Sequence, residues 1–359
     1  MLYELLYSLK DQFHALNVVR YLTFRSLLSF LFSLSFVLIF QPKFIQWFRK
    51  RELAQPIRSD GPQRHQAKAG TPTMGGLVLV LAVVFGTLLF ADLRNPYVWA
   101  TLGVTVSYGA LGFLDDYRKL HDKSSAGVSA RLKMIWQVGS ACFFLYVLQY
   151  FVPGFSTEVH IPFFKNLVVD LGVLFVPFAA FVIVGCSNAV NLTDGLDGLV
   201  IGPTMTVAAA YGVFAYTAGN FKAAQYLQIP YVAGCGDLSI FAAAIVAGGL
   251  GFLWFNSFPA QIFMGDVGAL ALGGALGMLA VATKQEIILA FAGGVFVVEA
   301  LSVIAQVTSF KMFGKRIFRM APLHHHYELK GLEEPKIIVR AWIISIVLAL
   351  LSLATLKLR

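Results

Sequence analysis

The sequence has few charged residues: Asp, Glu, Lys and Arg together make up 13% of its 359 residues. Hydrophobic residues make up 58%, and the mean hydropathy is +0.72. About a quarter of the residues of an ordinary soluble domain are charged, so the composition excludes that class. Repeated apolar runs of about 20 residues instead predict an all-α, polytopic integral membrane protein.

Cysteine is also scarce, and its three copies, Cys142, Cys186 and Cys235, lie in or beside apolar runs. An odd, scattered set argues against a disulfide framework and against a zinc site. The first ten residues contain Glu4 and no small-residue cleavage motif, so we expect no cleavable signal peptide. The basic residues flank apolar runs and form no DNA-binding motif, so we expect no nucleic-acid partner.

The hydropathy predicts one transmembrane domain over residues 1–359, without an internal repeat. Residues 1–20 carry an apolar stripe at helical spacing and predict a short amphipathic helix in the membrane interface. A bundle over 21–356 is expected to contain about ten spans: 22–40, 75–91, 97–114, 134–152, 168–187, 199–217, 239–255, 267–282, 287–308 and 337–356. The connection 153–166 weakly suggests a small hairpin. The loops expected on one face are 41–74, 115–133, 186–198, 256–266 and 309–336.

The basic residues indicate how the spans are oriented. Nineteen Lys and Arg residues lie in or beside the loops after spans one, three and nine, whereas only four follow spans two, four, six and eight. The positive-inside rule places the first set of loops in the cytoplasm and both termini outside it. Repeated glycines, including Gly248, Gly249, Gly273, Gly274 and Gly277, favour close packing of helices.

Between two long apolar runs lies Gly185–Leu199, which reads G-C-S-N-A-V-N-L-T-D-G-L-D-G-L. On a helix, Asp194 and Asp197 would share one face, because they are three residues apart. Gly195 and Gly198 follow the two acids and allow a ligand or another backbone to approach closely. An ordinary polar helix cap is the alternative, but a cap needs one such residue, and this stretch holds five: Asn188, Asn191, Thr193, Asp194 and Asp197.

Two further acidic positions lie at the same predicted face. Asp115 and Asp116 close the third span, and Asp266 opens the eighth, where the helix dipole favours a carboxylate. Adjacent acids repel, so a cation or lysine is expected beside them, and Mg²⁺ takes carboxylate and phosphate oxygens. The alternatives are a solvated helix end paired with Arg118 and Lys119, and an ordinary N-cap at Asp266.

Three other features carry weaker signals. Gly70–Gly76 follows Lys68 and is either a phosphate-binding helix start or a tight turn. His324, His325 and His326 point in different directions and could bind phosphate, a sugar or a metal, although no cysteine pair supports zinc. Glu299 lies within a span, where an acid is either functional or bonded to a neighbouring helix. Acids, histidines and lysines at one membrane boundary predict a site for an anionic substrate with a metal ion.

The motifs N-x-x-N-L-T-D-G-L-D-G-L, G-F-x-D-D-Y, F-M-G-D-V-G-A-L, G-T-P-T-M-G-G and A-P-L-H-H-H-Y-E together resemble those of the polyprenyl-phosphate N-acetylhexosamine-1-phosphate transferases. The resemblance runs from Lys68 to Glu328, in the same motif order. The P-L-H-H-H run resembles the branch that uses a muramoyl-pentapeptide donor.

This resemblance implies transfer of phospho-N-acetylmuramoyl-pentapeptide from UDP-N-acetylmuramoyl-pentapeptide to undecaprenyl phosphate, which yields lipid I and UMP. It also implies a Mg²⁺-dependent homodimer in the bacterial cytoplasmic membrane. By motif match, Asp115, Asp116 and Asp266 are the expected catalytic residues, with Asp266 binding Mg²⁺. The expected uridine pocket is Lys68, Gly195, Leu196, Asp197, Asn256 and Phe263, the last stacking on uracil. The other substrate-binding residues that we expect are Thr73, Lys123, Lys133, Asn188, Asn191, Asp194, Gln306, His324, His325 and His326.

Two alternatives of function and one of mechanism remain open from the sequence. A transporter for an anionic lipid or nucleotide sugar would place its site near the membrane midplane and show paired repeats, and neither is seen here. A related transferase would use UDP-N-acetylglucosamine. The transfer proceeds either in one step, with Asp115 as a base, or in two steps through an aspartyl-phosphate.

Overall fold

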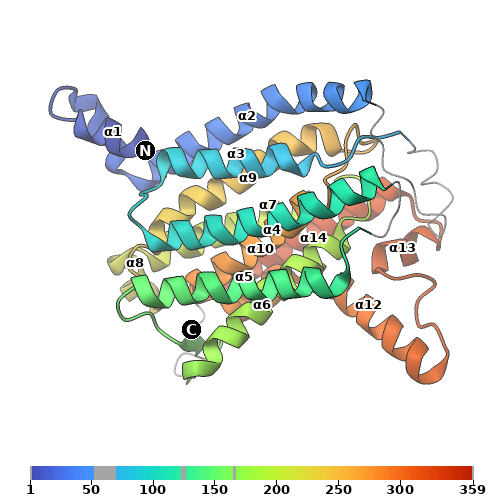
Figure 1. Cartoon of the computed structure of the whole chain (residues 1–359). Helices are drawn as coiled ribbons and strands as arrows, with labels where there is room; N and C mark the ends of the chain where they lie inside the picture. The colour runs from blue at the N-terminus through green and yellow to red at the C-terminus, as the bar shows by residue number, and fades with distance from the viewer. Residues whose placement is uncertain (1, 52–69, 123–126, 165–166, 358–359) are drawn as a thin grey trace.

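A computed structural model describes residues 2–51, 70–122, 127–164 and 167–357 (Figure 1). Apart from one small hairpin, the regular elements among these residues are all helices. The α-helices are α1 (Leu2–Ser8), α2 (Leu22–Lys50), α3 (Gly76–Phe90), α4 (Pro96–His121), α5 (Ala130–Phe151), α6 (Phe175–Thr193), α7 (Ile201–Ala218), α8 (Phe221–Leu227), α9 (Leu238–Asn256), α10 (Gly265–Ala282), α11 (Glu286–Ala292), α12 (Gly294–Phe313), α13 (Leu323–Glu328) and α14 (Glu334–Ala354). Short 3₁₀ helices are η1 (His14–Arg20), η3 (Gly172–Leu174) and η4 (Cys235–Asp237).

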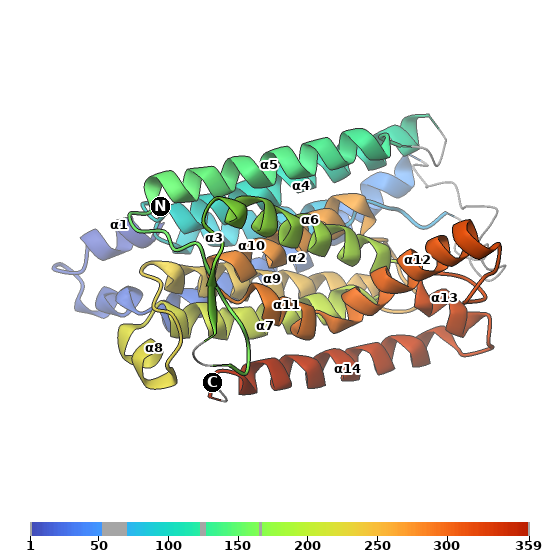
Figure 2. The same cartoon turned by 90° about the horizontal axis from the view of Figure 1, so that it is seen from below.

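The long helices lie side by side along one axis of the molecule, and α10 lies at their centre (Figures 1 and 2). Every residue of α10 from Val267 to Ala282 is buried. The helix packs against α4, α6, α3 and α7. A Cβ at Gly273 or Gly277 would press on the backbone of α6, which confirms that these glycines permit close helix packing.

Eight helical segments in the described residues are long and apolar enough to cross a membrane, so the chain is a polytopic membrane protein. They are α2, α4, α5, η3 with α6, η4 with α9, α10, α12 and α14. The other two predicted spans correspond to α3, which is shorter, and to α7, which is not among the eight. A total of ten spans therefore stays a prediction.

Three predicted boundaries are wrong. The span over 287–308 is two helices, because α11 ends at Ala292 and α12 begins at Gly294, and paired glycines are a common place for a helix to break. The span over 168–187 begins late, since Val168–Asp170 forms strand β2, which pairs antiparallel with β1 (Glu158–His160). This pairing confirms the hairpin. The N-terminal amphipathic segment is not one helix but α1 followed by η1.

Several helices also run into segments that the sequence assigned to loops. Helix α2 continues to Lys50 because Ile45 and Phe48 extend its buried stripe. Helix α4 continues to His121, so Asp115 and Asp116 lie on a helix one to two turns before its end. Helix α1, helix α8 and the end of α14 lie at one end of the bundle, whereas the end of α4 and helix α13 lie at the other (Figures 1 and 2).

Candidate active site

Three carboxylates meet where α4 crosses the start of α10. One carboxylate oxygen from each of Asp115, Asp116 and Asp266 lies within 4.8 Å of the others, and we call these residues the carboxylate cluster. The two helices approach closely because residue 112 is glycine, where a Cβ would overlap the carbonyl group of Asp266. Oδ2 of Asp116 accepts the N–H of Val267 at 3.1 Å, so an acid on α4 caps the first turn of α10.

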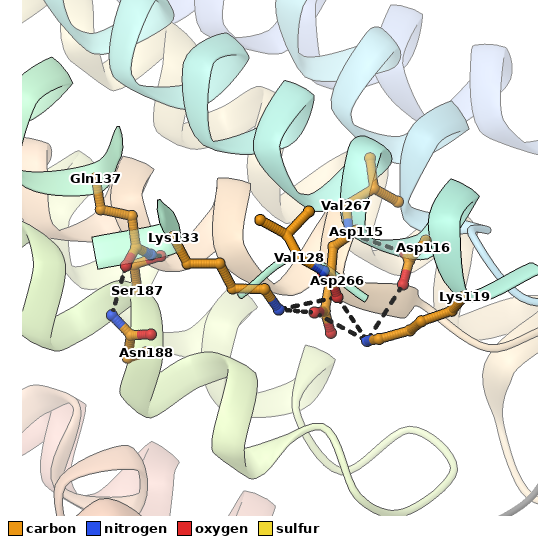
Figure 3. Close-up of polar contacts among 10 residues, drawn as sticks. All are labelled: Asp115, Asp116, Lys119, Val128, Lys133, Gln137, Ser187, Asn188, Asp266 and Val267. Atoms are coloured by element: carbon orange, nitrogen blue, oxygen red, sulfur yellow. Dashed lines mark hydrogen bonds and ion pairs between the residues drawn. The ribbon is translucent and has the colours of Figure 1, made fainter. Parts of the chain in front are cut away.

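Two lysines enter this cluster from different helices (Figure 3). Nζ of Lys119 lies 2.6 Å from Oδ2 of Asp115 and 3.2 Å from Oδ2 of Asp266. Nζ of Lys133, on α5, lies 2.9 Å from both of those oxygens. Three carboxylates against two ammonium groups leave one negative charge in excess, which favours an additional cation. From the sequence, Lys119 was named only as a partner of the acids at a solvated helix end. Its position four residues after Asp115, on the same helix face, could have indicated this ion pair.

Asp115 is the most enclosed member of the cluster, with a fully buried side chain. Its Oδ1 accepts the N–H of Val128 at 2.6 Å, and its Oδ2 faces the two lysines. Gly127 lies against this carboxylate, where a Cβ would overlap Oδ1. Asp115 therefore holds the loop before α5 and both lysines, whereas Asp116 and Asp266 reach the adjacent cavity.

A cavity of about 210 Å³ opens beside the cluster and gathers residues from five separate segments. It is lined by Thr73, Asp116, Asp194, Gly195, Leu196, Asp197, Asn256, Phe263, Gly265 and Asp266. The structure thus brings together nine of the sequence-predicted residues, with Gly265 in addition. The hydroxyl of Thr73 is buried without a hydrogen-bond partner among the described residues, so a ligand in this cavity would supply one.

The two acids of the G-L-D-G-L motif lie on a turn and not on one face of a helix. Helix α6 ends at Thr193, and the following turn carries Asp194 and Asp197 into the cavity wall. Oδ2 of Asp197 accepts the N–H of Ala260 at 3.0 Å. Oδ1 of Asn256 accepts the N–H of Gly198 at 3.0 Å. The two acids therefore do not share a helix face, as they would if the motif were helical, but both still reach one site.

The cavity wall is strongly acidic. Burial raises the pKa of Asp194 to about 8, and the charges of Asp266, Asp116 and Asp197 add to this rise. With this pKa, Asp194 is mostly protonated at neutral pH, so repulsion of a phosphate-bearing substrate comes from the excess negative charge of the carboxylate cluster, which a cation would offset. The carboxylate oxygens of the cluster are a donor set that a hard divalent cation prefers.

Comparison with known proteins agrees with this geometry. Residues 98–284 match the family described as Glycosyl transferase family 4, and residues 68–80 match Phospho-N-acetylmuramoyl-pentapeptide-transferase signature 1. The chain is 56% identical to the phospho-N-acetylmuramoyl-pentapeptide-transferase of Citrifermentans bemidjiense and 54% identical to that of Nitratidesulfovibrio vulgaris, over the full length of each. The corresponding protein of Syntrophus aciditrophicus is 56% identical, again over the full length of both chains. The chain belongs to the phospho-N-acetylmuramoyl-pentapeptide-transferase family. The predicted transferase class is thereby confirmed.

The transferase signature overlaps the glycine-rich segment before α3, and the structure shows how that segment is used. The N–H groups of Gly75 and Gly76 donate to the carbonyls of Phe263 and Met264, each at 2.9 Å. These amides are therefore not free to bind phosphate, because they pair with the segment just before α10. The glycine-rich segment instead fixes Thr73 and Phe263 on the two partner segments of one backbone pairing, in which the N–H of Phe263 donates to the carbonyl of Pro72 at 2.8 Å.

The three histidines of the transferase lie on α13 and have separate contacts. His324 is buried against Gly195, where a Cβ would overlap its Nε2. Its Nδ1 is 3.2 Å from Oε2 of Glu299, out of line for a hydrogen bond, and the same oxygen accepts the His324 backbone N–H at 3.3 Å. His325 pairs with Glu328 at 2.7 Å, and His326 accepts the N–H of Arg319. Glu299 therefore bonds a neighbouring helix, one of its two predicted interpretations.

The remaining predicted residues lie outside the cavity wall. Asn188 donates to Gln137 at 3.0 Å, in a partly buried contact between α6 and α5 (Figure 3). Asn191 lies in the last turn of α6. Gln306 accepts the N–H groups of Ile317 and Phe318 and lines a separate cavity of about 610 Å³. The predicted residues Lys68 and Lys123 lie outside the described residues of the transferase.

Proposed function

We propose that this chain transfers phospho-N-acetylmuramoyl-pentapeptide from UDP-N-acetylmuramoyl-pentapeptide to undecaprenyl phosphate, forming lipid I and UMP in peptidoglycan synthesis. Family membership supports the donor, because the full-length relatives carry that activity in their names. The observation that carries the chemistry is the meeting of Asp116 and Asp266 with a cavity at one end of the helical bundle. At a membrane boundary, a water-soluble donor and the phosphate of a lipid can reach one another.

Mg²⁺ is the cation that we propose for this site. Asp116 and Asp266 would hold it, since both face the cavity, and buried Oδ1 of Asp116 has no hydrogen-bond partner among the described residues. When bound, the ion offsets the repulsion between two phosphate groups and stabilises the charge that develops on UMP. Hard oxygen donors and an excess of negative charge are the features that fit it.

The lysines have a complementary role in this proposal. Lys119 and Lys133 are held by Asp115 and Asp266, so their ammonium groups stay beside the cavity instead of turning to solvent. Their positive charges favour an approaching phosphate. Asp115 acts here by positioning both lysines, since each of its oxygens already has a partner.

The transfer itself is proposed as one displacement. An oxygen of the lipid phosphate forms a bond to the sugar-linked phosphorus of the donor as the bond from that phosphorus to the UMP oxygen breaks. We place the uridine in the cavity, where Phe263 is half-buried and can stack on the base. Incubation with the donor alone tests the alternative, because a trapped phosphorylated aspartate would establish the two-step route.

The membrane arrangement belongs to the same proposal. The chain is placed in the bacterial cytoplasmic membrane as a homodimer with ten spans, the site facing the cytoplasm and both termini outside. The lysine and arginine distribution supports this orientation. The positions of α1 and the end of α14, at the end of the bundle opposite to α13, support this topology (Figures 1 and 2).

Release of UMP tests the function. The purified chain in detergent, supplied with Mg²⁺ and undecaprenyl phosphate, should release UMP from UDP-N-acetylmuramoyl-pentapeptide and form lipid I. UDP-N-acetylglucosamine should release little under the same conditions. Release from UDP-N-acetylglucosamine alone would assign the related transferase activity. No release from either donor, by protein that is monodisperse, would overturn the proposal.

A further inference from the structure

We propose that the first turns of α14 position the nucleotide-binding turn, with Glu334 and Trp342 as the positioning residues. The acid turn is defined here as residues 194–200, which follow α6 and carry Asp194 and Asp197 into the cavity wall. This inference rests on the proposed function, because it assumes that the uridine nucleotide binds against the acid turn.

Two hydrogen bonds join α14 to the backbone of the acid turn. Oε1 of Glu334 accepts the N–H of Asp197 at 3.0 Å. The indole N–H of Trp342 donates to the carbonyl of Gly198 at 3.0 Å. Two neighbouring residues of the turn, Asp197 and Gly198, are thus held through their backbones by α14 residues more than 130 positions away in the sequence. Gly198 itself has a φ of +77°, so this turn has a backbone conformation that glycine favours.

Apolar side chains also join the acid turn to α14. Leu196 and Leu199 of the acid turn form a small hydrophobic cluster with Ile337 and Ile338 of α14, separate from the main core, and Trp342 packs against it. The indole of Trp342 lies over Gly202, where a Cβ would overlap Nε1. Both the charged and the apolar side chains at the start of α14 therefore contact the turn.

The acid-turn residues Asp194 to Asp197 line the cavity. Oδ2 of Asp197 is held by the N–H of Ala260, and Gly195 is supported by His324 from its other side. With its backbone fixed by α14, the turn presents Asp194, Gly195 and Leu196 to a nucleotide in one arrangement. A fixed arrangement lowers the ordering cost of binding, so loss of the α14 contacts should weaken nucleotide binding more than it slows the chemical step.

Titration of UMP into detergent-solubilised protein with Mg²⁺ tests this inference. Trp342→Phe keeps an aromatic side chain, smaller than the indole, and removes the N–H donor, whereas Glu334→Ala removes the acceptor. Each variant should raise the Kd for UMP, and the KM for the nucleotide sugar, about 3- to 10-fold, as expected for one hydrogen bond. The KM for polyprenyl phosphate and kcat should change less than about 2-fold. Glu334→Gln should bind UMP as the unaltered chain does, because its amide oxygen still accepts the N–H.

Matched controls separate positioning from general damage. Trp99→Phe removes an indole hydrogen bond of the same type, to the carbonyl of Leu93 at 2.7 Å, in the first turn of α4, close to where Arg94 pairs with Glu4 of α1. Glu333→Ala removes the exposed neighbour of Glu334. Both controls should leave the Kd for UMP unchanged. Equal weakening by Trp99→Phe, equal rises in the KM of both substrates, or unchanged UMP binding by both test variants would overturn the inference. Absence of UMP binding by the unaltered chain would instead overturn the proposed function.

Discussion

Asp266 is the member of the carboxylate cluster with the most exposed side chain, at 15% against 0% for Asp115 and 1% for Asp116. Asp266→Asn keeps the shape of the side chain and removes the charge that faces both lysines and the cavity. We expect UMP release to fall by about 10² or more, the size of effect seen when one preorganised electrostatic contact is lost. Measurement of turnover together with size-exclusion behaviour checks this. Asp11→Asn, at an exposed position near the N-terminus, should keep full activity. Normal rates for Asp266→Asn would remove that residue from the site.

Gly195 provides a test of how tightly the cavity wall is packed. A methyl group at this position would overlap Nε2 of the buried His324, whose backbone N–H is bonded to Glu299. Gly195→Ala should therefore destabilise the wall by about 1–3 kcal/mol and weaken UMP binding. Thermal unfolding in detergent and UMP titration measure the two effects. Gly185→Ala is the matched control, because nothing lies within 4 Å of a Cβ there. Similar losses in both variants would show that contact with His324 is not the cause.

At the scale of residues, the sequence predicted which side chains gather but not all of their contacts. Thr73, Asn256 and Phe263 were predicted from short motifs and do line the cavity. Asn188 is instead engaged with Gln137, because a polar side chain in a helix bonds whichever neighbour the packing supplies. Glu334 and Trp342 carry no local signal, since their partners on the acid turn lie far away in the sequence.

The crossing of α4 and α10 determines where the carboxylates lie, and Gly112 permits it. A Cβ there would overlap backbone atoms of Asp266, which cannot turn aside as a side chain can. Gly112→Ala should move the start of α10 away from Asp115 and Asp116, lowering turnover at least about 10-fold and the melting temperature by several degrees. UMP release and thermal unfolding measure the outcome. Gly139→Ala on α5 serves as the control, since a Cβ there has nothing within 4 Å. Full activity of Gly112→Ala would contradict this account of the crossing.

Hydropathy predicted which apolar helices are present better than it predicted where a helix breaks. The apolar run 287–308 predicts one span, yet the chain breaks between α11 and α12 at Gly293 and Gly294. The residues before and after this break are equally apolar. The hydropathy pattern therefore cannot show that one helix ends and another begins there. The acid turn shows the opposite case: it lies in a segment that was expected to be a loop, and α6 does end at Thr193, so Asp197 can reach Ala260.

For the whole molecule, one end of the bundle carries the chemistry. Asp116, Asp194 and Asp266 come from junctions that alternate along the chain, and an alternating topology brings such junctions to one face. This placement depends only on the number and order of spans, which is why hydropathy could predict it without any knowledge of side-chain packing. The prediction that this face lies toward the cytoplasm depends only on the distribution of Lys and Arg among the loops.

Cysteine labelling tests which end of the bundle faces the cytoplasm. In a background in which Cys142, Cys186 and Cys235 are replaced by Ala, Lys222→Cys is placed on α8 and Lys315→Cys just beyond α12, both at exposed positions at opposite ends of the bundle (Figure 1). On intact cells, a membrane-impermeant maleimide should label position 222 and not position 315, and permeabilised cells should show both. The reverse pattern would put the carboxylate cluster on the outer face, where a nucleotide sugar made in the cytoplasm could not reach it. Labelling of both positions on intact cells would contradict a bundle that spans the membrane with these ends on opposite sides.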